Sequence, residues 1–139
     1  MKLKIYTLFL MLAAFQWASA QQKPNDPIGE SFFPPELVMQ HQQAIGLTDE
    51  QKEFFKAEMR KAQLKFTELQ WQLQDEVEKM VSIVKHDQVD EQQSLAQLDR
   101  VLAVEREIKR LQFTLVIMIK NKLTPDQRAR LAELRQKAR

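Results

Sequence analysis

The sequence predicts an all-α protein, built on one long antiparallel helical hairpin with short helices on its N- and C-terminal sides. Glycine and proline are almost absent after residue 35, where only Gly46 and Pro125 remain. Strands joined by turns need such residues frequently, so their absence favours helices. Apolar residues also recur every three or four positions through two long segments, which is the period of an amphipathic helix. The motif Leu-Thr-x-x-Gln occurs at residues 47–51 and 123–127 and marks two helix starts.

Both copies of the motif have the composition of a capping box. In the first copy, the Thr48 hydroxyl can accept a hydrogen bond from the backbone N–H of Gln51, whose side chain can reach back to the Thr48 N–H. The second copy repeats this arrangement with Thr124 and Gln127, and adds Pro125 at the first helical position, where a missing N–H costs nothing. The motif residues that we expect to cap helices are Leu47, Thr48, Gln51, Leu123, Thr124 and Gln127.

The first twenty residues have the pattern of a secretory signal peptide. Lys2 and Lys4 precede an apolar stretch at residues 5–15, and Ala-Ser-Ala at residues 18–20 matches a cleavage site. An uncleaved N-terminal anchor is the alternative, but a membrane span needs about 20 apolar residues. We therefore predict a cleaved signal peptide at residues 1–20 and an exported mature chain that does not span a membrane.

Cleavage makes the chain electrically neutral. The full sequence has 21 basic and 19 acidic residues; the signal peptide removes two lysines and no acid, and 21 minus 2 leaves 19 of each sign. A neutral chain lacks the excess of basic residues typical of nucleic-acid binding, so no nucleic-acid partner is expected. Because the chain contains no cysteine, packing or oligomerisation must stabilise it in place of disulfides.

The mature chain divides into a leader and one helical domain. Residues 21–34 contain three prolines and a glycine, which predicts a flexible, extended leader. The helical domain spans residues 35–139. It begins with a short helix from Pro35 to about Ile45, closed by Gly46 in the left-handed conformation.

Two long helices form the body of the domain. The first is expected at residues 49–85, and the second runs from a further capping pair, Asp90 and Gln93, to about Asn121. A last helix should extend from Pro125 to near the C-terminus. The apolar stripe of the first long helix consists of Phe55, Met59, Ala62, Phe66, Leu69, Leu73, Val77, Met80 and Val84, and that of the second consists of Leu95, Leu98, Leu102, Ile108, Leu111, Leu115 and Met118.

Two apolar regions are too large to be buried by one hairpin, so further packing surface is expected for each of them. The run at residues 113–119 is apolar around the whole helix, which predicts a homodimer. Its candidate interface residues are Phe113, Val116, Ile117 and Ile119. Phe54, Ala57, Leu64 and Trp71 form a second apolar row on the first long helix, rotated away from the main stripe. This row either packs against the leader and short helices or forms a binding surface, and the sequence leaves both open.

The two motifs, the signal peptide and the hairpin between them resemble the Spy/CpxP family of periplasmic proteins. The segment at residues 33–39 is most similar to the heavy-metal sensor and resistance branch of that family. The resemblance implies an antiparallel, cradle-shaped dimer. It also implies ATP-independent protection of unfolded periplasmic proteins, or regulation of an envelope-stress sensor protein. In such a cradle, Phe54, Leu64 and Trp71 become candidates for client binding.

A heavy-metal-binding sensor or resistance protein of the same fold is the alternative function. Zinc, nickel, cobalt or copper requires several imidazole, carboxylate or thioether ligands brought together in space. The chain offers Glu36 and His41 near the first short helix and Met118 near the end of the second long helix, whereas His86 lies in the hairpin turn. A closed site needs three or four ligands, so a resident metal or other cofactor is not expected.

The sequence shows no arrangement typical of an enzyme. Two histidines, no cysteine and two glycines leave no activated nucleophile and no glycine-rich phosphate loop. A chaperone or stress-response binding protein is therefore the leading hypothesis, and we expect no enzymatic activity. A structural adapter that docks on a membrane protein is a third possibility.

Overall fold

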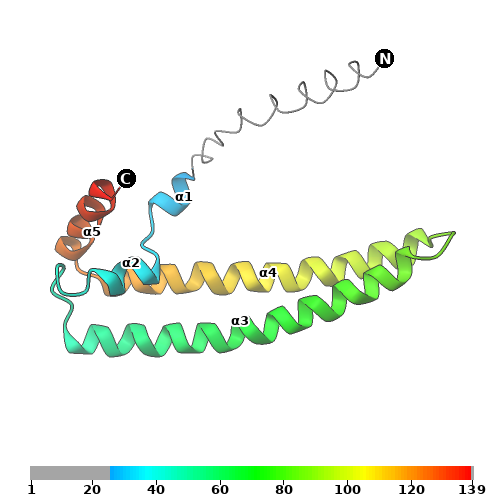
Figure 1. Ribbon diagram of the computed structural model, residues 1–139, viewed down its shortest axis with the longest axis horizontal. Coiled ribbons are helices and arrows are strands. Elements are labelled where there is room, and N and C mark those ends of the chain that lie inside the picture. Colours follow the sequence, from blue (N-terminus) through cyan, green and yellow to red (C-terminus); the bar gives the residue numbers. More distant parts are fainter. Residues whose placement is uncertain (1–25, 139) are drawn as a thin grey trace, which may run out of the picture.

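The computed structural model describes residues 26–138, and their arrangement is shown in Figure 1. The predicted signal peptide and residues 21–25 lie outside this range. The helices are α1 (Pro27–Glu30), α2 (Pro35–Gln40), α3 (Asp49–Val84), α4 (Glu91–Lys122) and α5 (Pro125–Lys137). Residues 26–138 contain no strand, and α3 packs along α4, so the predicted all-α hairpin is confirmed. None of the helices in this range has the length and apolar character needed to cross a membrane.

The hairpin has two different ends. In Figure 1, α3 and α4 lie side by side along their length, while α1, α2 and α5 all gather at one end. We call that end, with the adjoining parts of α3 and α4, the closed end. The opposite end, residues 73–102 with the connecting turn, is the tip. The elements gather in this way because residues 26–48 directly precede α3 and α5 directly follows α4.

Segment 35–47 differs in part from the prediction. Helix α2 ends at Gln40, and hydrogen-bonded turns carry the chain on to Gly46. The Leu47 N–H donates to the carbonyl of Gln42 at 2.9 Å, and the Gly46 N–H donates to that of Gln43 at 3.1 Å. This pair of bonds is the Schellman arrangement, and Gly46 has a φ of 63°, as predicted. The glycine therefore reverses the chain into α3 in a conformation that a side chain would strain.

Residues 26–34, which belong to the predicted flexible leader, are folded against the closed end. The Asp26 side chain accepts from the Gly29 N–H at 2.9 Å and caps α1, where Pro27 occupies the first helical position. Phe33 is buried in the core. The prolines therefore bend this segment, and burial of its aromatic side chain offsets the cost of ordering it.

The hydrophobic core lies at the closed end. Its buried members come from α2, α3, α4 and α5 or from the loops beside them: Phe33, Val38, Ile45, Leu47, Phe55, Ile119, Leu123 and Leu131. Ile119, a predicted dimer-interface residue, is almost fully buried inside the single chain. The apolar run at residues 113–119 therefore receives part of its cover from within the chain, because the N-terminal segment and α5 pack around the end of α4.

The tip leaves much of its apolar stripe open to solvent. The exposed apolar side chains there are Val77, Val81, Val84, Val89, Leu95, Leu98 and Leu102. Two helices that meet only each other share one contact line, and side chains on either side of that line remain accessible. The tip thus carries the largest set of uncovered aliphatic side chains among the described residues.

Candidate functional site

The two motifs form the predicted capping boxes. In the first, the Gln51 N–H donates to the Thr48 hydroxyl and the Thr48 N–H donates to Gln51 Oε1, each at 3.1 Å. In the second, the corresponding distances are 3.2 Å to the Thr124 hydroxyl and 2.9 Å to Gln127 Oε1. Both boxes are complete. The prediction that these residues start α3 and α5 is confirmed.

The two motif glutamines also bind each other. Gln51 Nε2 donates to Gln127 Oε1 at 2.8 Å, and Gln127 Nε2 donates to Gln51 Oε1 at 2.9 Å. The second proton of each amide goes to the carbonyl just before the other motif, at Lys122 (2.9 Å) or at Gly46 (3.3 Å). We call this pair, Gln51 and Gln127, the glutamine latch. It joins the start of α3 to the start of α5 with local two-fold symmetry.

The latch explains why both motifs carry glutamine. A glutamate could complete either capping box, since that task needs only an acceptor. The reciprocal pair needs one donor and one acceptor on each side chain, which an amide has and a carboxylate lacks. Both glutamines are buried, and no buried side-chain N or O atom in the described chain is without a partner. The repeated glutamine was thus a signal for the pairing that the sequence analysis missed.

Phe54, one of the predicted client-binding residues, is part of the closed end. It packs against the core, contacts the Phe55 ring edge-to-face at 5.8 Å, and lies under the Lys122 ammonium group at 5.0 Å. Lys122 also pairs with Glu50 at 2.8 Å, and this hydrogen bond holds the pKa of the Glu50 carboxyl below its usual value. For Phe54, the packing alternative therefore describes the structure better than an open surface.

Leu64 and Trp71 are placed differently from Phe54. Leu64 is 69% exposed and Trp71 is 64% exposed, both on α3. Trp71 lies beside Leu73 and Val77, where a shallow hollow of about 500 Å³ follows the helix toward the tip. These side chains extend the uncovered apolar surface of the tip along α3.

The predicted metal ligands lie at two helices, α2 and α4. Glu36 is exposed near the start of α2, His41 is half-buried at its C-terminal cap, and Met118 is half-buried in α4. His86 is in the connecting turn, at the tip. Within residues 26–138, no three or more His, Cys, Asp or Glu side chains form a group suited to a metal ion. The described residues therefore do not fit a resident metal held by such ligands.

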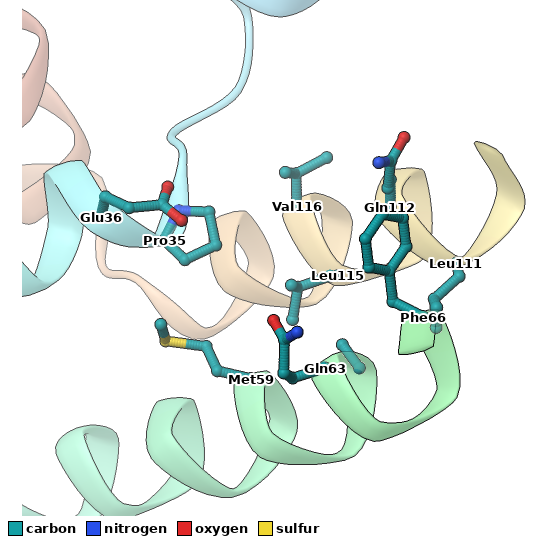
Figure 2. A pocket seen from close by; sticks show the side chains of 10 residues that line it. Pro35, Glu36, Met59, Gln63, Phe66, Leu111, Gln112, Leu115 and Val116 are labelled. Atoms are coloured by element: carbon teal, nitrogen blue, oxygen red, sulfur yellow. The ribbon is translucent and has the colours of Figure 1, made fainter. Parts of the chain in front are cut away.

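A groove runs between α2, α3 and α4 at the closed end (Figure 2). Its volume is about 300 Å³. Figure 2 shows Pro35 and Glu36 at one side, Met59 and Gln63 rising from α3, and Leu115 on α4 opposite them. The floor is largely apolar, and Glu36 is the only charged residue lining it. The groove has the shape and chemistry to accept an apolar side chain from another polypeptide.

The comparison with protein families gives one match. The model of the heavy-metal resistance family matches residues 3–130, which is most of the chain. No curated protein and no solved structure matches the chain. The match agrees with the Spy/CpxP-like fold class and with the heavy-metal branch that the segment at residues 33–39 indicates. This chain therefore belongs to the heavy-metal resistance family.

Proposed function

We propose that this protein is a periplasmic component of heavy-metal resistance. The family match over residues 3–130 is the observation that carries this proposal. It favours a role in metal stress over that of a general envelope-stress chaperone, the leading hypothesis from the sequence. The periplasmic location follows from the predicted signal peptide.

For the mode of action, we propose binding of exposed polypeptide segments. Among the described residues, no three or more His, Cys, Asp or Glu side chains are grouped as metal ligands, whereas Leu64, Trp71 and the tip present uncovered apolar side chains. Large exposed apolar patches mark sites of interaction with other proteins. Metal ions bind cysteine and histidine in unfolded chains and thereby increase the unfolded population by mass action. A protein that holds unfolded segments would counter this damage without ATP and without catalysis.

A genetic test separates the two parts of this proposal. Cells that lack the gene should grow less well at elevated zinc, nickel, cobalt or copper, and the intact gene should restore growth. A gene with Leu64→Ser and Trp71→Ser should fail to restore it, whereas one with His41→Ala should succeed. Equal metal tolerance with and without the gene would contradict the resistance role.

The activity can also be measured with the purified mature chain. It should slow the aggregation of an unfolded test protein, and Leu64→Ser with Trp71→Ser should weaken this effect while the helix content stays constant. Lys65→Ser, at an exposed position of the same helix outside the apolar row, is the matched control. Full activity in the double variant would show that this surface does not hold clients.

Direct metal binding is the second candidate, favoured by the description of the family. Glu36, His41 and Met118 are its candidate ligands, and a second copy of the chain would have to complete the set. Titration calorimetry with zinc, nickel, cobalt and copper tests this candidate. One tight ion per chain or per dimer, lost in His41→Ala, would replace polypeptide binding with metal sensing as the proposed mode of action.

We further propose that the mature chain is a homodimer. The apolar surface of the tip remains open to solvent and Ile117 is half-buried, whereas Phe113 already meets the Phe32 ring of the same chain. Acidic residues outnumber basic ones at residues 73–99, and the opposite holds at residues 106–137. An antiparallel dimer would place these opposite charges together. Light scattering should give twice the chain mass at micromolar concentration, and a monomer mass would exclude the dimer.

A further inference from the structure

The N-terminal segment at residues 26–33, which we call the strap, lies against the closed end of the hairpin. The Phe32 ring meets the Phe113 ring of α4 edge-to-face at 5.2 Å. The next side chain, Phe33, is buried in the core. Two adjacent aromatic residues therefore attach the strap to the hairpin, one at its surface and one inside it.

Two cationic side chains hold the backbone of the strap. Lys120 Nζ, on α4, donates to the carbonyl of Ser31 at 2.8 Å. Arg135, on α5, donates to the carbonyl of Glu30 at 2.8 Å and to that of Phe32. Three successive carbonyls are thus bound by charged donors from two different helices. These hydrogen bonds are made to main-chain carbonyls, which every residue of a peptide carries.

The same two cations also contact aromatic rings. Lys120 Nζ lies 5.2 Å from the centre of the Phe32 ring, and the Arg135 guanidinium lies 4.9 Å from that of Phe33. At this distance, a cation is attracted to the face of an aromatic ring. The site therefore binds two features of a peptide, namely its consecutive carbonyl groups and its adjacent aromatic side chains.

The strap fills this site incompletely. Phe113 is still 47% exposed beneath it, and Ile28 is 62% exposed. Two open grooves lie beside the strap, and both are lined by Pro35, Gln112 and Val116. Strap residues Ile28, Gly29 and Phe32 form part of the groove of about 310 Å³, whereas none of them lines the groove of about 300 Å³. The hydrogen bonds from Lys120 to Ser31 and from Arg135 to Glu30 are solvent-exposed. Contacts of this kind open more easily than core packing.

We propose that Lys120, Arg135 and Phe113 form a peptide-binding site, which the strap occupies in the free chain. A segment with adjacent aromatic residues, from an unfolded or partly unfolded protein, replaces the strap by adopting the same turn and making the same carbonyl and ring contacts. The groove between α2, α3 and α4, which the strap does not line, accepts a neighbouring apolar side chain of that segment. This inference rests on the proposed binding of polypeptide segments, and it names the class of segment and the means by which the free site is masked.

The absence of cysteine allows a direct test in the full mature chain. Ser31 is exposed, so Ser31→Cys can carry an environment-sensitive fluorophore that reports whether the strap is docked. The probe is a synthetic peptide with the sequence of residues 27–34, and its control has alanine in place of both phenylalanines. The phenylalanine peptide should give a saturable fluorescence change, and the alanine peptide should bind at least tenfold more weakly.

Substitutions in the site complete the test. Lys120→Met and Phe113→Ser, each in the labelled chain, should weaken peptide binding at least tenfold with helix content unchanged. Lys56→Met is the matched control, because the Lys56 ammonium group pairs only with Glu53 on the same exposed face of α3. Peptide binding that survives both substitutions would overturn the proposal, and so would displacement of the strap by anionic lipid vesicles but not by the peptide.

The aggregation assay separates this inference from the proposed function. A chain that slows aggregation but does not bind the phenylalanine peptide would refute the strap site and leave the proposed polypeptide binding intact. A chain that binds the peptide but does not slow aggregation would support the strap site and refute the proposed holding of unfolded clients.

Discussion

The closed end and the tip are built from the same two helices, yet only the closed end has a core. Side chains from all five helical segments or the loops between them surround Phe55, Ile119 and Leu131 at the closed end. At the tip, α3 and α4 meet only each other, and Leu98 and Val81 stay exposed. The apolar period is similar in both regions. The two regions differ in the short segments that pack over the hairpin. These segments are attached next to the closed end and therefore cover only that end.

This difference indicates that the two ends of the hairpin have different roles, one in stability and one in presenting an exposed surface. The closed end supplies the stability, through burial, the glutamine latch and two capping boxes. The tip contributes little burial and is therefore free to present apolar side chains to another molecule. In a chain without cysteine, such a surface is tolerable only because the other end is well packed.

The largest expected effect is that of a core truncation at the closed end. Leu131 is 0% exposed, so Leu131→Ala should lower the free energy of unfolding by about 2–5 kcal/mol. Leu98→Ala, the same change at a residue of the tip that is 40% exposed, should cost much less. Urea denaturation followed by circular dichroism measures both. Similar losses would mean that the tip is buried in the native assembly, which would support the dimer.

Loss of the glutamine latch should give the second-largest decrease in the free energy of unfolding. Gln127→Ala leaves the buried amide of Gln51 without its partner, and such a loss costs about 1–3 kcal/mol. The double change Gln51→Ala with Gln127→Ala should show a coupling of about 0.5–3 kcal/mol, because the two residues form one network. Additive losses would show that each glutamine acts only within its own capping box.

Gln97 offers a matched comparison for the latch. It is the buried glutamine of the tip, and its amide donates to the carbonyl and the carboxylate of Glu76 at 2.8 and 2.7 Å. Glu76 keeps a second partner in Lys79, so Gln97→Ala should cost less than Gln127→Ala. An equal or larger loss would place an important stabilising contact at the tip and weaken the proposed division between the two ends.

The sequence predicts local features of this fold well, because they depend on neighbouring residues. Helix starts at Thr48 and Thr124 and the left-handed Gly46 follow from short motifs. Apart from the pairing of the two long helices, contacts between distant segments were not predicted. The pairing of Gln51 with Gln127 crosses more than seventy residues, and its only signal is the identity of the two motifs.

The surface of the candidate site was also only partly predictable. The exposure of Leu64 and Trp71 follows from their rotation away from the main apolar stripe. The burial of Phe54 and Ile119 does not, since it depends on where the N-terminal segment and α5 pack. The packing of the strap against the helices was not predicted, for the same reason. Its prolines suggest an extended leader, whereas its aromatic residues contact helices far along the chain.

A smaller effect is expected from the helix caps. Thr48→Ala or Thr124→Ala should each lower the free energy of unfolding by about 0.5–2 kcal/mol, because each removes one capping acceptor while leaving the latch amides in place. Asp90→Ala, at the exposed cap of α4 beside the tip, should cost less than either. Thermal melts of the three variants compare them directly, and a larger loss at Asp90 would reverse the expected order of the two ends.

The smallest expected effect is the pH dependence of two carboxyl groups, one from each region. The hydrogen bond from Lys122 lowers the pKa of Glu50 at the closed end, and hydrogen bonds from Lys79 and then Gln97 lower the pKa of Glu76 at the tip. A folded pKa below the ordinary value of 4.5 means that the deprotonated form stabilises the fold. This stabilisation is complete above that value and is lost as the pH falls through the lower, folded pKa.

Melting temperatures at pH 7 and in steps below 4.5 test these two contributions separately. Glu50→Gln and Glu76→Gln should each flatten the acid side of the stability profile and leave its shape above pH 5 almost unchanged, since both carboxylates are already ionised there. The Lys122 partner of Glu50 lies on a different helix, whereas the Lys79 partner of Glu76 lies one turn away on α3. Glu50→Gln should therefore flatten the profile more, because its pair joins two elements of the closed end. A larger effect of Glu76→Gln would show that the Gln97 contact, rather than the Lys122 pair, is the stronger carboxylate link between α3 and α4.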